Sequence, residues 1–251
     1  MGYPLIFVHG IGASETIWKR KHISGHSDFY ISFSNRFADP ADQVPELAEF
    51  INGVLQKTGE KKIILVCHSM GGLVARKYLE DNKEDHRVEK LVLLSTPNLG
   101  SIGLSFNWLP LLLIILGLSG FKFVWPVLLS LLGLLWELIS LSRGVLLLSP
   151  AVWAMRPGSD FLKELNSKKM PEDIKYISVL SDTKFLPHRL MNLLLFREGG
   201  DGAVALSSQK LSEKCAPNFS RINYQEIRVN LPHFAIPKKA QSAIREAIEA
   251  A

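Results

Sequence analysis

Residues 62–75 read Lys-Ile-Ile-Leu-Val-Cys-His-Ser-Met-Gly-Gly-Leu-Val-Ala, and this stretch decides the fold. Its apolar first half predicts a buried strand over residues 63–67, and the spacing of apolar residues from 73 to 79 predicts a helix. A strand that passes into a helix through so short a turn forces Ser69 into a strained backbone conformation, which the small neighbour Gly71 permits. We therefore predict that Ser69 is a nucleophile presented by a sharp turn at the end of a strand.

One residue of this turn departs from the usual pattern. The strict form has glycine two residues before the serine, where this chain has Cys67. A small side chain is tolerable there, and Gly72 allows the helix to pack close to the sheet. A plain strand-to-helix turn, in which Ser69 only caps the helix, would use similar residues. That alternative does not explain a second glycine-rich motif near the start of the chain.

The second motif is His-Gly-Ile-Gly-Ala-Ser at residues 9–14, directly after the apolar run at 5–8. Acyl transfer requires backbone N–H donors aimed at the developing oxyanion, and one such donor contributes about 3–4 kcal/mol in known enzymes. Glycines leave the backbone of a loop open for this purpose. We expect the amide of Met70, at a helix N-terminus, to be one donor and the amide of Ile11 to be the other. The alternative is a glycine-rich turn that binds nothing.

The apolar runs along the chain predict the sheet around these motifs. Six short runs have the composition of strands, and most are continuous apolar blocks, as expected when both faces of a sheet are covered. The expected strands are residues 5–8, 29–33, 63–67, 88–94, 174–180 and 224–229. The expected helices are residues 44–56, 73–79 and 240–250. Strands that alternate with helices predict an α/β fold with right-handed crossovers and a mostly parallel sheet.

The two glycine motifs resemble those of the bacterial lipases and esterases of the α/β-hydrolase family. The matching residues are Val-His-Gly-Ile-Gly at 8–12 and His-Ser-Met-Gly-Gly at 68–72, and the resemblance covers residues 4–100 well. It extends to Ser-Thr-Pro-Asn-Leu-Gly-Ser at 95–101, a loop type common in these lipases. The resemblance implies an α/β-hydrolase fold with a small six-stranded, mostly parallel sheet and a helical lid insertion. It also implies that serine, acid and histidine follow in this order along the chain.

This order places the acid and the base downstream of the apolar middle of the chain. His188 and His233 are the histidines there, and we favour His233, because it follows the last expected strand and precedes the last expected helix. For the acid we favour Asp201, because Gly-Asp-Gly-Ala-Val at 200–204 is similar to the acid loop of many lipases. Asp182 is the alternative acid, since it directly follows a strand after which this fold presents one.

The histidines within the two motifs are expected to be structural. His9 should orient the oxyanion loop, and His68 should face away from the pocket across the end of its strand. No cluster of histidine, cysteine and aspartate has the spacing of metal ligands, so neither a metal nor another cofactor is expected.

Together these residues predict a serine carboxylesterase or lipase that acts on apolar acyl esters. His233 would take the proton of Ser69, Asp201 would orient the imidazolium, and water would release the acyl-enzyme. An acyltransferase or a thioesterase on the same fold would use the same residues. The third alternative is an inactive hydrolase fold that binds a membrane or a protein. The expected partner is a lipid or ester substrate, and the sequence leaves acyl length, alcohol part and oligomeric state open.

Residues 104–152 interrupt the alternation of strands and helices, so the hydrolase core is expected to comprise residues 1–103 and 153–251. The charged residues of this insertion are Lys122, Glu137 and Arg143. Its uncharged runs are borderline for spanning a membrane, which takes about 20 apolar residues, and prolines and glycines break them. We predict an apolar helical lid that closes over Ser69 in water and opens at a membrane or lipid interface. A transmembrane hairpin and an immobile buried cap are the alternatives.

The composition is that of an ordinary globular protein, with 47% hydrophobic and 21% charged residues. The net charge of +5 comes from scattered basic residues without a recognition motif, so nucleic-acid binding is not expected. The two cysteines do not make a disulfide framework. The first residues lack the basic region and cleavage site of a secretory signal, which favours a cytoplasmic or peripherally membrane-associated protein. Secretion stays open if a leader precedes these residues.

Overall fold

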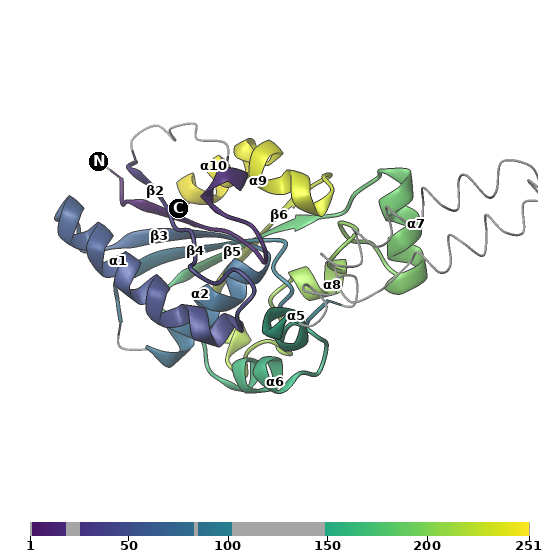
Figure 1. Ribbon diagram of the computed structural model, residues 1–251, viewed down its shortest axis with the longest axis horizontal. Helices are drawn as coiled ribbons and strands as arrows, with labels where there is room; N and C mark the ends of the chain where they lie inside the picture. The colour runs from purple at the N-terminus through teal and green to yellow at the C-terminus, as the bar shows by residue number, and fades with distance from the viewer. Residues whose placement is uncertain (1, 19–25, 83–84, 102–148, 251) are drawn as a thin grey trace, which may run out of the picture.

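One parallel sheet forms the centre of the protein (Figure 1). The computed structural model describes residues 2–18, 26–82, 85–101 and 149–250. In these residues six strands lie in the order β2-β1-β3-β4-β5-β6, and each pairs in parallel with its neighbours. The strands are β1 (Leu5–Val8), β2 (Asp28–Tyr30), β3 (Ile63–His68), β4 (Val88–Leu94), β5 (Lys175–Ser181) and β6 (Asn223–Val229). All six expected strands are therefore present.

Helices cover both faces of this sheet. The helices are α1 (Val44–Thr58), α2 (Met70–Asp81), α5 (Pro150–Ala154), α6 (Asp160–Ser167), α7 (Leu186–Leu195), α8 (Leu206–Gln209), α9 (Ile236–Lys239) and α10 (Gln241–Glu249). Short 3-10 turns are η1 (Glu15–Ile17), η2 (Pro40–Gln43), η3 (Phe219–Arg221) and η4 (His233–Ala235). Figure 1 shows α1 and α2 on one side of the sheet and α9 and α10 on the other. The helix expected from residue 73 begins already at Met70, because β3 passes into α2 directly after Ser69.

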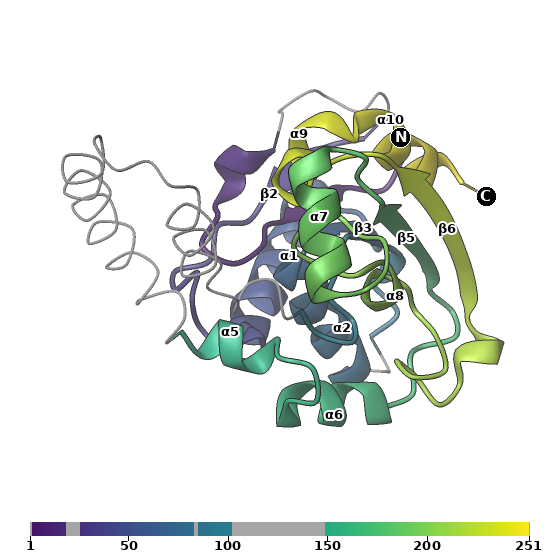
Figure 2. The ribbon, with the colours of Figure 1, turned by 90° about the vertical axis from the view of Figure 1, so that its right-hand side faces the viewer.

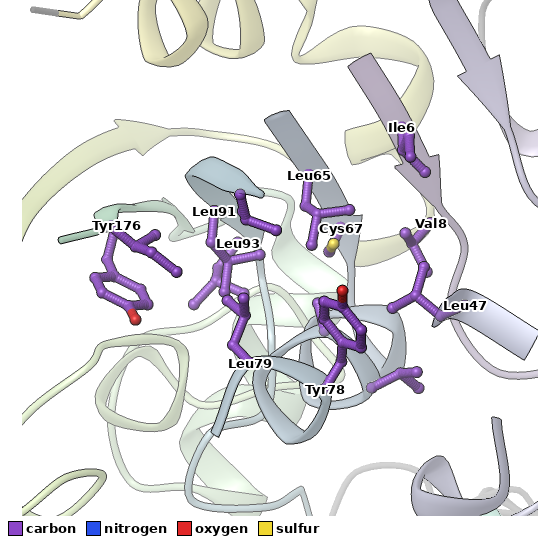
Figure 3. Close-up of a cluster of buried hydrophobic side chains, with 14 of the residues drawn as sticks. Ile6, Val8, Leu47, Leu65, Cys67, Tyr78, Leu79, Leu91, Leu93 and Tyr176 are labelled. Carbon is purple, nitrogen blue, oxygen red and sulfur yellow. The ribbon is translucent and has the colours of Figure 1, made fainter. Parts of the chain in front are cut away.

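The two faces of the sheet build separate hydrophobic clusters. Ile6 and Val8 of β1 pack in a cluster with residues of α1 and α2, whereas Leu5 and Phe7 pack with residues of α10. The same alternation runs through β3, where Cys67 belongs to the cluster shown in Figure 3. Because both faces are covered, these strands are continuous apolar blocks rather than alternating ones.

The edge strand β2 is shorter than the strand predicted over residues 29–33. Its pairing with β1 ends at Tyr30. Beyond that point the chain leaves the sheet, and the amide of Phe33 donates to Nε2 of His9 at 3.1 Å. The ring of Phe33 is buried in the cluster beneath α1. The strand ends early because the His9 ring offers an acceptor inside the fold, which the apolar pattern of the sequence does not reveal.

The described parts of the chain on either side of the expected insertion contribute to the same sheet, where β4 pairs with β5. The lid predicted over residues 104–152 lies outside the described residues except at its end. There α5 begins at Pro150 and packs through Ala151 in a cluster with Met70 and Leu73 of α2. Figure 2 shows α7 in front of one end of the sheet. Within the described ranges, no helix combines the length and the apolar content needed to cross a bilayer.

Candidate active site

Ser69 occupies a strained turn between β3 and α2, which we call the nucleophile turn (residues 68–72). Its backbone has φ +54° and ψ −125°, a combination that residues with a side chain rarely adopt. A Cβ at Gly71 would lie 2.5 Å from the carbonyl oxygen of His9, and one at Gly72 would overlap the hydroxyl of Thr96. The two glycines therefore allow α2 to begin directly against the ends of β1 and β4.

Cys67 stands where the strict form of this turn has glycine. Its side chain is fully buried and lies in the hydrophobic cluster between the sheet and helices α1 and α2 (Figure 3). Burial raises the pKa of the thiol well above its usual value, which keeps the group neutral. The position accepts a small apolar side chain because it faces the core.

The side chains of Ser69, His233 and Asp201 form one hydrogen-bonded chain. Nε2 of His233 lies 3.0 Å from Oγ of Ser69, and Nδ1 of His233 lies 2.7 Å from Oδ2 of Asp201. Because a carboxylate only accepts, Nδ1 carries the proton of the neutral ring, and Nε2 accepts from the serine hydroxyl. The three residues are 2%, 3% and 0% exposed, respectively, so bulk water scarcely competes for these bonds.

Backbone hydrogen bonds hold Asp201 in a tight loop, residues 199–204, which we call the acid loop. Its Oδ1 accepts from the amides of Ala203 at 2.9 Å and Val204 at 2.8 Å, so Oδ2 is left for His233. The carbonyl of Asp201 also accepts from the amide of His233 at 3.0 Å. Asp201 and His233 are thus joined twice, once through their side chains and once through the backbone.

Asp182, the alternative acid, supports the acid loop instead of the histidine. It follows β5, and its Oδ1 accepts from the amide of Gly200 at 3.0 Å. Asn192 of α7 holds the same loop, since its amide donates to the Gly200 carbonyl at 2.7 Å and its oxygen accepts from Gly202 at 2.9 Å. Sequence reasoning missed Asn192, because nothing in a leucine-rich helix marks one buried amide as special. Asp182 and Asn192 position the loop that carries Asp201.

His188, the alternative base, lies on α7. Its ring packs against Phe185 with 5.2 Å between the ring centroids, and it also lies next to Gly202 of the acid loop. The structure therefore places His188 beside the acid loop and His233 beside Ser69.

The two residues expected to supply oxyanion donors flank Ser69. Met70 is the first residue of α2, where an amide has no acceptor within its own helix and where the helix dipole is positive. Ile11 lines a cavity together with Ser69. Gly10 brings this loop close to Ser69, because a Cβ at Gly10 would lie 2.9 Å from the Cβ of Ser69.

His9 orients the loop that carries Ile11, as its place in the motif predicts. Its Nδ1 donates to the Gly10 carbonyl at 2.8 Å, and its Nε2 accepts from the Phe33 amide at 3.1 Å. Burial lowers the pKa of His9, which favours the neutral ring that this pair of bonds requires.

His68 faces the pocket, so the prediction that it faces away was wrong. Its ring centroid lies 4.8 Å from that of His233, and its Nε2 donates to the His233 carbonyl at 3.2 Å. Strand alternation turns Cys67 toward α1 and α2 and therefore His68 toward the opposite face. The prediction failed because the sequence does not show that the loop after β6 brings His233 to that same face.

A cavity of about 50 Å³ opens onto Ser69 and His233. Its walls are mostly apolar and consist of Gly10, Ile11, Ala13, Ile17, His68, Ser69, His233, Phe234 and Pro237. A larger hollow of about 530 Å³ lies against β2 and α1 and is lined by other residues, among them Phe29 and Phe50. Across the described ranges, no group of three or more histidine, cysteine or acidic side chains is arranged to hold a metal ion.

The parallel sheet and the strained serine turn, with Asp201 and His233 following Ser69 in the chain, define an α/β-hydrolase fold. Residues 37–204 match the family described as a domain of unknown function (DUF7379), and the chain belongs to this family. The mature form of the lipase BlEst2 from Bacillus licheniformis has the same fold. Its TM-score is 0.68 at 19% identity, and the match covers 98% of this chain and 90% of that one.

Two curated proteins share sequence with part of the chain. The lysosomal thioesterase PPT2-B of Xenopus laevis is 31% identical over 111 residues, which are 41% of this chain and 38% of that protein. The GPI inositol-deacylase of Candida albicans is 27% identical over 134 residues, which are 43% of this chain and 33% of that protein. The matched part of the chain thus spans 38% and 33% of the two relatives, respectively.

Proposed function

We propose that the protein is a serine hydrolase of carboxylic esters with apolar acyl chains, a lipase or esterase. The observation that carries this proposal is the hydrogen-bonded chain from Ser69 through His233 to Asp201. Ser69 is held at φ +54°, which costs about 1–3 kcal/mol of backbone strain, and its hydroxyl meets a histidine there. The lipase fold of BlEst2 and the deacylating relatives support the same class of reaction.

In the proposed reaction, Oγ of Ser69 attacks the carbonyl carbon of the ester while Nε2 of His233 takes the hydroxyl proton. The amides of Ile11 and Met70 donate to the oxyanion, and Asp201 stabilises the imidazolium. His233 then gives its proton to the leaving alcohol. A water molecule attacks the acyl-enzyme with the same proton transfers, which releases the carboxylic acid and restores the serine.

The lining of the cavity supports an apolar substrate. Ile11, Ile17, Phe234 and Pro237 surround the reacting side chains. A charged group placed among them would lose its hydration without gaining a partner, which is costly. Esters whose parts next to the reacting carbonyl are uncharged therefore fit this site.

A thioester is the second candidate bond. The PPT2-B relative, at 31% identity over 111 residues, is a thioesterase. Thioesters react with the same nucleophile, base and oxyanion donors. The preferred substrate class must therefore be determined by kinetic measurements. Oxygen and sulfur esters of one acyl chain should be compared by kcat/KM. A preference of more than about 100-fold for the sulfur ester, equivalent to roughly 2.7 kcal/mol of transition-state stabilisation, would assign a thioesterase.

Covalent labelling tests whether Ser69 is an activated nucleophile. A fluorophosphonate probe should label the wild-type protein and hydrolysis of p-nitrophenyl esters should be lost with labelling, because only an activated serine attacks the phosphorus atom. The Ser69→Ala variant should take up no probe and hydrolyse no ester. Wild-type protein that is folded, yet neither labelled nor active, would contradict the proposal.

Ser95→Ala is a matched control for this experiment. Ser95 follows β4 as Ser69 follows β3, has φ +48° and is 1% exposed. Its hydroxyl donates to Gln209 rather than to a histidine. Labelling should therefore survive in Ser95→Ala, and its loss would show that the probe reports on local folding.

A further inference from the structure

A buried glutamine lies behind the acid loop. Gln209 is the last residue of α8 and is 1% exposed. Its Nε2 donates to the carbonyls of Val204 and Ser181, at 3.0 Å each, and its Oε1 accepts from the amide of Ser181 at 2.6 Å. The hydroxyl of Ser95 donates to the same oxygen at 3.2 Å. One side-chain amide thus connects the acid loop with the ends of β4 and β5.

The orientation of this amide is fixed by the backbone groups around it. The N–H of Ser181 can only donate, so it must face the oxygen of Gln209. The carbonyl of Val204 can only accept, so it must face the nitrogen. A rotated amide would leave both buried backbone groups without a partner, which is costly. Gln209 therefore holds the carbonyl of Val204 in one place.

Val204 in turn contacts Asp201. Its amide donates to Oδ1 of Asp201 at 2.8 Å, and its carbonyl also accepts from the amide of Asp201 at 3.3 Å. The other carboxylate oxygen of Asp201 lies 2.7 Å from Nδ1 of His233. A displacement of Val204 would therefore turn the carboxylate relative to the imidazole ring. Hydrogen bonds lead in this way from Gln209 to the residue that contacts His233.

Gln209 is itself held by the helix that follows Ser69. Its carbonyl accepts from the side-chain amide of Asn98 at 3.1 Å. The oxygen of Asn98 accepts from the guanidinium of Arg76 in α2 at 3.2 Å. Arg76 is fully buried and also pairs with Glu80 at 3.0 Å. Gln209 is thus part of a buried polar network that joins α2 to the acid loop.

We propose that Gln209 is a positioning residue that keeps the acid loop in the place where Asp201 is aligned with His233. This inference rests on the proposed ester hydrolysis. The described residues that line the cavity at Ser69 do not include Gln209, so it does not touch the substrate there. It acts through Val204 and Asp201, and its loss affects the chemical step rather than substrate binding.

Gln209→Met removes all four hydrogen bonds of the side chain at nearly unchanged length. We expect kcat for p-nitrophenyl octanoate to fall by about 10–100-fold, because small displacements caused far from the reacting atoms can cost up to about 10²-fold. KM should stay within about 2-fold of the wild-type value, since the cavity lining is intact. A folded Gln209→Met variant with wild-type kcat would overturn the proposal.

A double-mutant cycle with Asp201→Asn tests whether Gln209 acts through Asp201. The readout is the rate of fluorophosphonate labelling at Ser69, which can be followed even in slow variants. Gln209→Met should slow labelling by about 10–100-fold in the wild type but by less than about 3-fold in Asp201→Asn, because the carboxylate that it aligns is absent there. An equal loss in both backgrounds would show a general disturbance of the fold and would overturn the proposal.

Gln209→Glu is a milder variant that decides the question if Gln209→Met does not fold. It keeps an oxygen for the amide of Ser181 and replaces the two N–H donors by at most one O–H donor. We expect a loss of kcat of about 10-fold, which should again disappear in the Asp201→Asn background. Wild-type kcat in Gln209→Glu, or an equal loss in both backgrounds, would contradict the role of Gln209.

Gln43→Met is the matched control. Gln43 is also a buried amide, 3% exposed, but it lies in η2, where its nitrogen donates to the carbonyl of Ala38 at 3.1 Å. This variant should keep kcat within about 2-fold of the wild type, because its hydrogen bond does not involve the acid loop. A loss as large as that in Gln209→Met would show that removing any buried amide lowers kcat, and would overturn the proposal.

Failure of this inference is distinguishable from failure of the proposed function. Labelling and ester hydrolysis by the wild-type protein report on Ser69 and do not depend on what Gln209 contributes. An active, labelled wild type together with normal kcat in the Gln209 variants would remove the positioning role and keep the esterase. A folded wild type that is neither labelled nor active would remove both.

Discussion

The nucleophile turn is formed by residues that are neighbours in the sequence, whereas the acid loop is placed by residues from other elements. Ser69 owes its conformation to the change from β3 to α2 and to the two glycines that follow it. Asp201 reaches His233 because Asp182 at the end of β5 and Asn192 of α7 hold its loop. A turn set by its own residues can be recognised from sequence, but a loop held by distant partners cannot be located in this way.

The largest expected effect tests the acid loop directly. Asp201→Asn should lower kcat by about 10⁴-fold, the loss seen when the aspartate of a serine protease triad is replaced, because an amide NH2 facing Nδ1 moves the ring proton to Nε2, which then cannot accept from Ser69. The asparagine oxygen can still accept from Ala203 and Val204, so the loop should keep its shape. The measurement is kcat for a p-nitrophenyl ester, together with the urea midpoint of unfolding.

Asp182→Asn is the matched variant for that experiment. It should lower kcat by no more than about 10-fold, because Asp182 contributes one hydrogen bond to Gly200 and none to His233 in the structure. Equal losses of kcat in Asp182→Asn and Asp201→Asn would contradict the proposal that Asp201 is the acid and that Asp182 only supports its loop.

Smaller effects are expected on stability. Here a substitution in the nucleophile turn should be more destabilising than one in the acid loop. Gly71→Ala should lower the free energy of unfolding by about 3 kcal/mol, because its Cβ would meet the backbone oxygens of His9 and Val8 at 2.5 and 2.9 Å. Gly202→Ala should cost about 1–2 kcal/mol, since it meets the movable side chain of His188 and strains a backbone at φ +94°. Urea denaturation of both variants measures the difference, and equal losses would contradict it.

The smallest expected effect is the contribution of His9 to the pH dependence of the free energy of unfolding. Burial lowers the pKa of His9 in the folded state, whereas the unfolded chain binds this proton near about pH 6.5. As the pH falls through that value, the unfolded state is protonated first, so the free energy of unfolding decreases until the folded-state pKa is reached. The slope is at most about 1.4 kcal/mol per pH unit for one histidine.

Glu80 acts in the opposite direction, because burial raises its pKa to about 7 and the folded state then binds the proton first. The useful measurement is therefore the difference in pH slope between the wild type and His9→Gln, in which the contribution of Glu80 cancels. We expect a shallower decrease below about pH 6.5 in His9→Gln than in the wild type. Parallel curves would show that His9 is not a buried neutral group.

Much of the fold could be predicted because β strands covered on both faces are continuous apolar blocks. All six occur where the sequence predicts them, and only β2 ends early, where His9 draws the chain inward. Ser69 could be recognised from the sequence because β3, the turn and α2 follow one another directly in the chain. The sequence left Asp182 as an alternative to Asp201, because Asp182 directly follows a strand and Asp201 lies in a glycine turn. Only the folded chain shows that Asp201 contacts His233. His68 was assigned to the wrong face, since the sequence around it does not show that His233 comes to that same face.

The hydrogen bond between Ser69 and His233 joins residues 164 positions apart in the chain. During synthesis the serine turn therefore emerges long before its histidine. The first four strands can pair while the chain still grows, but β6 and the residue it delivers come near the end. If Ser69 and His233 act as proposed, the serine has no base until then. The serine would therefore become reactive only when the last strand has joined the sheet.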